Sequence, residues 1–262
     1  VIRKNTFENV VAGIYWNLFE SSQFLNSVTI EQNQILLDPF FRGRFTTLSD
    51  LKGIALNCGQ KIENAVIREN TIKYFTERDE KFILPTYGMY LGNIENLVVE
   101  RNWIETKKET PIKCRSIDRI TAAQNYIVGY RFPNSFTSDS TPVMSDIQDW
   151  EADASQTFPT RSFAMRDSLF PSDVVSVNVR SEDQSVLPNR ALSLLRRSVM
   201  NTLSAGPFEG GPGESRITVT ATNPNGKSYT TWFIAKLEGK STIPACPVPV
   251  IPYFSRTLFY PL

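Results

Sequence analysis

The sequence predicts an all-β fold in which a stack of repeated coils is followed by a smaller β-rich module. Three observations support this prediction: a motif centred on Asn that occurs five times between residues 1 and 130, a second short motif that precedes four of its copies, and alternating apolar and polar residues near the end of the chain. A short repeat cannot bury its apolar face alone, so neighbouring repeats must stack and share one core.

The first motif places an apolar residue three positions before and two positions after each Asn. The Asn residues recur every ~20 to 40 positions, a spacing typical of solenoids. They are Asn5, Asn33, Asn70, Asn102 and Asn125; the apolar positions before them are Ile2, Ile30, Ile67, Val99 and Ala122, and those after them are Phe7, Ile35, Ile72, Ile104 and Ile127. Because strand side chains alternate, these positions point into a shared core. We expect each Asn to adopt left-handed backbone angles at a corner and to bond the next Asn in a ladder.

The second motif is a turn residue followed by a short alternating strand. Its copies are Gly13–Trp16, Gly53–Leu56, Gly88–Leu91 and Pro111–Cys114. Each coil therefore contains at least two strands, and the variation in coil length falls in loops.

Together the two motifs resemble those of the right-handed parallel β-helix superfamily, which includes pectate-lyase-like enzymes, several glycoside hydrolase families and many phage tailspikes. The resemblance covers roughly the first half of the chain. It implies a right-handed parallel β-helix followed by a small β-rich C-terminal module with one helix. The repeat itself is scaffold and does not define the chemistry.

We expect three parts: coils over 1–132, an aromatic-anchored linker or cap over 133–171, and the C-terminal module over 172–262. The anchors of the middle part are Phe136, Trp150, Phe158, Phe163 and Phe170. The first residues already lie in register within a coil, and a stack needs a terminal cap. We therefore expect further coils, a cap and any secretion signal upstream; the alternative is a first coil capped by another subunit.

Within the C-terminal module, four local patterns predict elements. Residues 174–179 alternate as a strand, and 189–203 has Leu192, Leu195, Val199 and Leu203 at helical spacing with Asn189 as N-cap. Residues 216–222 and 229–235 flank Asn225-Gly226, which predicts a hairpin. The tail over 243–252 alternates Pro with β-branched residues and predicts an extended strap.

The bulk composition excludes several classes of function. Lys and Arg number 28 against 27 Asp and Glu, a net charge of +1, which provides no broad field toward nucleic acid. The chain has no His and so has no His-based triad or His-ligated metal, and its three Cys match no zinc spacing. No Asp-rich run predicts a calcium site. We expect no metal, no cofactor and no membrane insertion, since no stretch reaches the ~20 apolar residues of a spanning helix.

The candidate site lies on the outer face of the second motif, where alternation points Tyr15 with Asn17, Ala55 with Asn57, Tyr90 with Gly92, and Lys113 with Arg115 outward. A Tyr ring covers the apolar face of a sugar, while amides and cations bind hydroxyls and carboxylates. The predicted substrate-binding residues are Tyr15, Asn17, Asn57 and Tyr90. On an anionic polysaccharide, Arg115 would neutralise the uronate carboxylate and Lys113 would remove the C5 proton in a β-elimination. The alternative is an ordinary polar outer face.

A glycosidase would instead need two carboxyl groups about 5 to 9.5 Å apart. Asp38, Asp50 and Asp118 in flanking loops are candidates, and we include Asp118 among the catalytic residues with Lys113 and Arg115. A second outward column, two positions before each Asn, alternates in charge through Arg3, Glu31, Arg68 and Glu100 and predicts a structural ladder.

These patterns and the resemblance lead us to expect an extracellular, cell-surface or virion protein that binds and depolymerises a complex polysaccharide, as a lyase or a glycoside hydrolase. The alternative is a non-enzymatic structural or adhesive protein, such as a trimeric tailspike stem or a surface adhesin, in which the C-terminal module assembles a homotrimer.

Overall fold

The structure is an all-β protein. The computed structural model describes residues 1–10, 12–16, 26–37, 51–74, 86–105, 111–128, 136–153, 158–206 and 211–239. No α-helix occurs in these ranges; the one helical element is a single 3₁₀ turn, η3 (Asn189–Ala191). The predicted loops at 37–45 and 74–81 fall almost entirely outside the described residues, and the Pro-rich strap at 243–252 lies wholly outside them.

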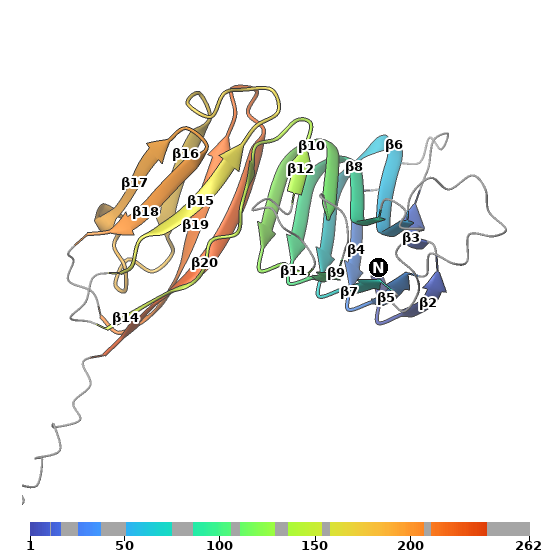
Figure 1. Cartoon of the computed structure of the whole chain (residues 1–262), viewed down its shortest axis with the longest axis horizontal. Coiled ribbons are helices and arrows are strands. Elements are labelled where there is room, and N and C mark those ends of the chain that lie inside the picture. The colour runs from blue at the N-terminus through green and yellow to red at the C-terminus, as the bar shows by residue number, and fades with distance from the viewer. Residues whose placement is uncertain are drawn as a thin grey trace, which may run out of the picture.

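Strands in the first half of the chain alternate between two parallel sheets (Figure 1). The first sheet runs through β1 (Ile2–Arg3), β4 (Ser27–Glu31), β6 (Leu51–Arg68), β8 (Thr86–Glu100) and β10 (Ile112–Ala123), with β3 (Ala12–Trp16) paired to β6 and β12 (Phe136–Ser138) paired to β10. The second sheet contains β2 (Thr6–Val10), β5 (Gln34–Leu37), β7 (Thr71–Tyr74), β9 (Trp103–Glu105) and β11 (Tyr126–Val128). Equivalent positions of successive motifs pair directly, as in Ile30 with Ile67 and Ile67 with Val99.

The long strands β8 and β10 each bend at a residue with left-handed backbone angles. These residues are Asn93, with φ of 58°, and Ser116, with φ of 52°. The pairing of β6 with β8 shifts in register between Asn57 and Ile62, at the corresponding place. Each long strand therefore has a first limb (51–57, 86–92 or 112–115) and a second limb (62–68, 94–100 or 117–123).

The corner before the second sheet differs from our prediction. We expected the repeated Asn to adopt positive φ, but the residue directly before it does so: Lys4, Gln32, Glu69, Arg101 and Gln124 have φ between 52° and 57°. The Asn side chain is held by the ladder instead. The Asn70 amide group donates to the carbonyl oxygens of Ile30 and Arg68 and to Asn102 Oδ1, at 3.0 Å each. Its own Oδ1 accepts from Asn33, so the predicted Asn ladder is confirmed.

Seven of the ten apolar positions of the first motif are buried in the core, as predicted, and Ile2, Phe7 and Ile127 are half-buried against it. Ile30, Ile67, Val99 and Ala122 are fully buried, and Ile35, Ile72 and Ile104 are at most 2% exposed. The Gly of the second motif is required by this packing. A Cβ atom on Gly53 would lie 2.6 Å from Ile72 Cγ2 and 2.7 Å from the carbonyl oxygen of Gly88. Ile35, Ile72 and Ile104 thus each pack directly against a Gly backbone of the opposite sheet.

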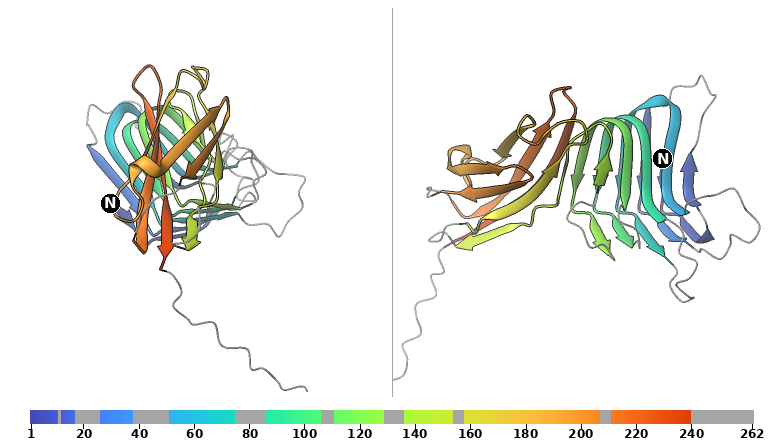
Figure 2. Two further views of the ribbon diagram at one scale, coloured as in Figure 1. Left: turned by 90° about the vertical axis from the view of Figure 1, so that its left-hand side faces the viewer. Right: turned by 45° about the horizontal axis from the view of Figure 1, so that its top comes forward.

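The first sheet continues without a break into the C-terminal part (Figure 2). The second limb of β10 pairs in parallel with β20 (Ser228–Glu238), which is followed by β19 (Gly213–Thr222) and β16 (Ser176–Ser181); β14 (Trp150–Asp153) pairs with the other end of β20. A four-stranded sheet of β13 (Val143–Met144), β15 (Arg161–Arg166), β18 (Met200–Ala205) and β17 (Leu192–Arg197) contributes to the same apolar core. Strands β19 and β20 form the predicted hairpin, with Gly226 at φ of 74°.

The predicted helix over 189–203 is wrong. After η3 the chain forms the antiparallel pair β17 and β18, which turns at Ser198 with φ of 50°. The same residues also have a period of two: Asn201, Leu203 and Ala205 are buried and alternate with half-buried neighbours. Pairing of β18 with both β15 and β17 selects that period. Asn189 does not cap a helix; its Oδ1 accepts the backbone N–H of Ser181 at 2.8 Å.

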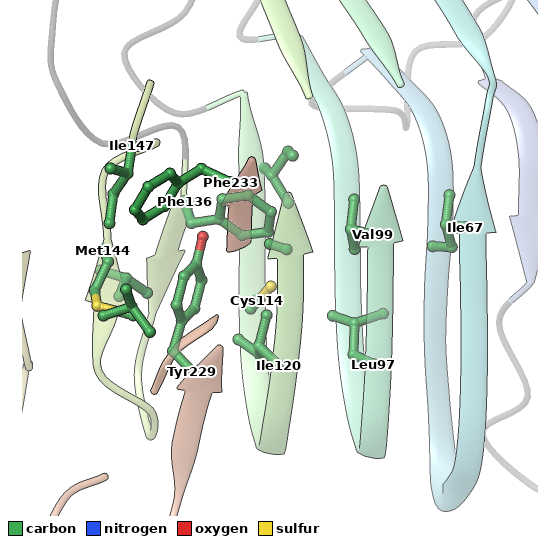
Figure 3. Close-up of a cluster of buried hydrophobic side chains, with 14 of the residues drawn as sticks. Ile67, Leu97, Val99, Cys114, Ile120, Phe136, Met144, Ile147, Tyr229 and Phe233 are labelled. Atoms are coloured by element: carbon green, nitrogen blue, oxygen red, sulfur yellow. The ribbon is translucent and has the colours of Figure 1, made fainter. Parts of the chain in front are cut away.

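The described residues between 133 and 171 add strands to both parts. Strands β12 and β14 both belong to the first sheet, where β12 pairs with β10 and β14 pairs with β20, whereas β13 and β15 belong to the four-stranded sheet. Four of the five aromatic anchors, Phe136, Trp150, Phe158 and Phe163, are at most 4% exposed, and Phe170 is half-buried. Figure 3 shows Tyr229 of β20 between Met144 and Cys114, with its hydroxyl group directed toward the rings of Phe136 and Phe233. The two halves therefore share one core.

Candidate functional site

A basic aromatic face covers the outer side of the first limbs. We define this face by Tyr15, Lys52, Tyr87, Tyr90, Lys113 and Arg115. In-register pairing aligns Tyr15 with Ala55, Ala55 with Tyr90, and Tyr90 with Lys113. Tyr15 is 51% exposed, whereas Ala55 is 1% exposed because its larger neighbours cover it. Adjacent strands are about 4.8 Å apart, so side chains from successive repeats address one extended ligand.

Two lysine ammonium groups lie over the tyrosine rings of this face. Lys113 Nζ is 5.6 Å from the ring centroid of Tyr87 and 5.8 Å from that of Tyr90. Lys52 Nζ is 5.1 Å from the Tyr90 centroid. The two rings stand edge to face with centroids 6.0 Å apart. Cation–π attraction of this kind is worth about 0.5 to 1 kcal/mol at exposed sites, which holds the cations and rings together as one surface.

Arg115 adds a third cation at the end of the face. Its Nη1 donates to the Tyr90 hydroxyl oxygen at 3.3 Å, and its Nε is 3.7 Å from Asp139 Oδ2. The Asp139 carboxylate also accepts the backbone N–H of Ser116 at 2.7 Å. The hydrogen bond to Tyr90 and the nearby Asp139 raise the pKa of Arg115. The guanidinium group is therefore charged and oriented, yet its side chain remains 60% exposed.

The structure brings together five of the predicted site residues: Tyr15, Asn57, Tyr90, Lys113 and Arg115. Asn57 pairs with Gly92 on the adjacent strand. A Cβ atom on Gly92 would lie 3.0 Å from Asn57 Oδ1, so the Asn57 side chain covers this glycine. Asn17 lies outside the described residues, as do the alternative acids Asp38 and Asp50.

Asp118 occupies a different environment from Lys113 and Arg115. It follows the bend at Ser116, on the second limb of β10, and its carboxylate binds Lys61 and Lys227. Burial raises the pKa of Asp118, but the hydrogen bonds from Lys227 and Lys61 outweigh it and leave the pKa below its usual value. Asp118 thus links β6, β10 and the β19–β20 turn as a charged group, and the described contacts give it no partner on the basic aromatic face.

Sequence reasoning missed three members of the site: Lys52, Tyr87 and Asp139. Lys52 and Tyr87 each directly precede the Gly of the second motif, so aligning the residue before each Gly would have found them. Asp139 follows β12, whose Thr137 pairs with Lys113. No sequence motif marks this strand, because the Asn-centred repeat ends before it.

Three further features of the described residues concern metal ligands, membrane spans and cysteines. They contain no group of three or more Cys, Asp or Glu side chains placed to hold a metal ion. None of the helical segments among them has the length and apolar character needed to cross a membrane. Cys58 and Cys114 are both buried, and burial raises the pKa of the Cys114 thiol.

The fold and this face define an all-β protein with an exposed aromatic and cationic surface. No family model and no curated protein matches the chain. Among solved structures it is similar to the N-terminal Ig1-2 module of the Drosophila receptor protein tyrosine phosphatase DLAR, with a TM-score of 0.31 and 14% identity over 40% of this chain and 53% of that one. Similarity to the twitchin kinase region of C. elegans has a TM-score of 0.27 and 19% identity over 37% of this chain and 16% of that one. The chain thus spans less than two thirds of either structure.

Proposed function

We propose that this chain binds an anionic polysaccharide along its basic aromatic face. The observation that supports the proposal is the cluster of three cations, Lys52, Lys113 and Arg115, around the rings of Tyr87 and Tyr90. Cations bind uronate carboxylates, and tyrosine rings stack on the C–H faces of sugars. Among the residues that the structure describes, Asp139 is the acid that pairs with this cluster, so three cations face one carboxylate.

We also propose that the repeats form a parallel β-helix. The direct pairing of equivalent motif positions, the alternation of the chain between two parallel sheets and the Asn ladder support this architecture. In such a stack, a polysaccharide lies along the outer face and contacts successive repeats. A substrate of this kind fits an extracellular, cell-surface or virion setting.

Binding is supported more directly than bond cleavage. The contacts of Lys113 Nζ with two tyrosine rings are those of a binding surface, whereas β-elimination also requires a base that accepts the C5 proton. A lyase reaction would use Arg115 against the uronate carboxylate and Lys113 Nζ as the proton acceptor, with the glycosidic oxygen leaving from C4. If the chain also cleaves the polysaccharide that it binds, we expect this lyase reaction, and the variants described below test it.

The test is polysaccharide binding by the double variant Lys113→Ala/Arg115→Ala. Each charge-assisted hydrogen bond contributes about 1.5 to 3 kcal/mol, so we expect affinity for a polyuronate to fall by at least about tenfold. Retardation in gels containing the polyuronate or a neutral glucan measures binding, and ultraviolet absorbance of the unsaturated product measures lyase activity.

A matched control removes two cations from elsewhere. Lys73→Ala/Arg101→Ala changes the net charge equally; Lys73 and Arg101 are exposed, and Arg101 pairs with Glu69. The proposal fails if both double variants bind the polyuronate equally, or if neither the parent nor the control prefers it to the neutral glucan. Absorbance that rises with the parent but not with Lys113→Ala/Arg115→Ala would establish the lyase reaction.

A structural or adhesive role is the second candidate, supported by an exposed aromatic pair on the second sheet. Trp103 and Tyr126 are 41% and 58% exposed, and their ring centroids are 4.3 Å apart. Such a pair fits burial in a homotrimer. Sedimentation of the parent and of Trp103→Ser/Tyr126→Ser tests the trimer: its loss in the variant supports this interface, and a monomeric parent excludes the homotrimer.

A further inference from the structure

A polar groove lies on the outer face of β16 and β19, at the end of the first sheet. Its residues are far in the sequence from those of the basic aromatic face. It has a volume of about 410 Å³ and is lined by Asn178, Arg180 and Glu182 of β16 and its end and by Thr218 and Thr220 of β19. Cross-strand pairing sets Asn178 opposite Thr220 and Arg180 opposite Thr218. Pockets for small ligands commonly occupy about 300 to 1,000 Å³, so the groove has room for one or two sugar rings.

The groove presents polar groups without protein partners. Within the part of the chain that the structure describes, the guanidinium group of Arg180 and the side-chain amide of Asn178 make no hydrogen bond or ion pair. Both side chains are exposed. Alternate residues of a strand lie about 6.6 to 6.8 Å apart, so these two donors and the two threonine hydroxyls form two rows along the groove. Thr220 Oγ1 is 3.1 Å from Thr230 Oγ1, which extends the hydroxyl row to β20.

The charges at the groove select one class of ligand. Arg180 offers a planar fork of donors that matches a carboxylate, while amide and hydroxyl groups match sugar hydroxyls. Glu182 lies at one end of the groove, 3.6 Å from Arg216 Nη1, and adds a negative charge there. A carboxylate accepts hydrogen bonds from sugar hydroxyls but repels phosphate and polyanionic peptides. A uronate ring, which carries several hydroxyl donors beside its one carboxylate, fits this arrangement better than either.

We propose that this groove is a second saccharide-binding site, which takes a uronate with its carboxylate on Arg180 and its hydroxyls on Asn178, Glu182 and the threonine row. The site is separate from the basic aromatic face, because it lies on β16 and β19 and uses none of the residues of that face. Two such sites on one chain would bind one long polyuronate with an affinity greater than either alone.

Trp232 provides an optical reporter for the groove. It pairs across the strands with Thr218, and the guanidinium carbon of Arg216 lies 4.6 Å from its ring centroid. A ligand that contacts Thr218 and Glu182 changes the environment of this ring and of Arg216. Ligand-dependent fluorescence that disappears in Trp232→Phe therefore comes from this ring. Because Trp232 also lines a second pocket with Asn125 and Asp149, weaker binding in Arg180→Gln is what assigns the ligand to the groove.

The experiment is a fluorescence titration of the whole chain carrying Lys113→Ala/Arg115→Ala, so that failure of the first site cannot affect the result. The probes are a short oligogalacturonide, a neutral glucan oligosaccharide of equal length and an oligoglutamate. We expect the oligogalacturonide to bind saturably and Arg180→Gln to weaken its affinity at least about tenfold. The control is Arg197→Gln, which changes an exposed arginine of the four-stranded sheet and should leave the affinity unchanged.

Three outcomes would overturn the inference. Equal affinity of the Arg180→Gln and parent chains for the oligogalacturonide would remove Arg180 from the site. Equal binding of the neutral oligosaccharide would remove the carboxylate requirement, and tighter binding of oligoglutamate would identify a surface for acidic peptides. Normal circular dichroism of Arg180→Gln ensures that weaker binding does not arise from unfolding.

Discussion

At the scale of single residues, the repeated Asn is the most constrained position of the stack. Asn33, Asn70 and Asn102 are each 1% exposed, and each amide group bonds to two backbone carbonyls and to the Asn of the next repeat. The residue before each Asn adopts positive φ, so the Asn satisfies the polar groups at a corner whose backbone turns one position earlier. An unsatisfied buried polar group costs about 1 to 3 kcal/mol, which makes the ladder sensitive to deletion.

We predict that Asn70→Ala lowers the free energy of unfolding by about 3 kcal/mol or more, because it removes three donated bonds and leaves the backbone N–H of Asn33 without its acceptor. Urea denaturation monitored by circular dichroism measures the change. Asn5→Ala is the matched control, since Asn5 is exposed at the end of the ladder, and we expect a loss of about 1 kcal/mol or less. Equal losses in the two variants would contradict the prediction.

At the scale of elements, ion pairs connect the strands of the first sheet. The carboxylate of Glu31, which is 3% exposed, binds Arg3 of β1 and Arg68 of β6. This arrangement confirms the predicted charge ladder across three repeats. At Glu100 a hydrogen bond replaces the ion pairs of the ladder: Glu100 Oε1 accepts the indole N–H of Trp232 at 3.2 Å. Ala123 lies on the intervening strand and is small enough for this contact, so the column extends from the repeats to β20.

The hydrogen bonds from Arg68 and then Arg3 lower the pKa of Glu31. A carboxyl group with a lowered folded-state pKa stabilises the fold above its unfolded value of about 4.3, and this contribution is lost as the pH falls through the folded value. We predict that Glu31→Gln melts at a lower temperature than the parent at pH 7, and that the difference narrows as the pH falls below about 4. Thermal melts across pH measure this. A difference that stays constant down to acid unfolding would exclude the ion pairs as its cause.

The repeat elements could be predicted because most repeats contain two recognisable motifs, one centred on Asn and one beginning with a turn residue. The apolar positions on both sides of each Asn specify which side chains enter the core, and the hairpin around Asn225-Gly226 follows from its turn chemistry. The strands β17 and β18 could not be predicted in the same way. Their leucines fit both a helical period and a period of two, and pairing with β15, which is distant in sequence, decides between them.

The candidate site was predictable only in part, for a related reason. Alternation after the Gly located Tyr90, Lys113 and Arg115, because strand geometry alone points them outward. The contacts of Lys52 with Tyr90 and of Arg115 with Asp139 join residues of different repeats. Those contacts depend on how the repeats align, which the loop lengths between motifs do not reveal.

At the scale of the whole molecule, one core and one sheet join the repeats to the C-terminal part. Tyr229 of β20 is fully buried, and its ring packs edge to face on Phe136 with centroids 5.6 Å apart. Its hydroxyl oxygen is buried without a hydrogen-bond partner among the described residues. Burial raises the pKa of the Tyr229 phenol, so the hydroxyl stays neutral. The Tyr229 hydroxyl is therefore a neutral, unsatisfied polar group among the apolar side chains of the junction.

We predict that Tyr229→Phe raises the free energy of unfolding by about 1 kcal/mol, because it removes the unsatisfied hydroxyl and keeps the ring. Tyr229→Ala should lower it by about 3 to 5 kcal/mol, the usual cost of deleting a buried aromatic ring. Because the core is shared, we expect this loss to appear equally in amide hydrogen exchange of β8 and of β19. Exchange that accelerates in β19 alone would show that the two parts unfold separately, and a destabilised Tyr229→Phe would show that the hydroxyl has a partner.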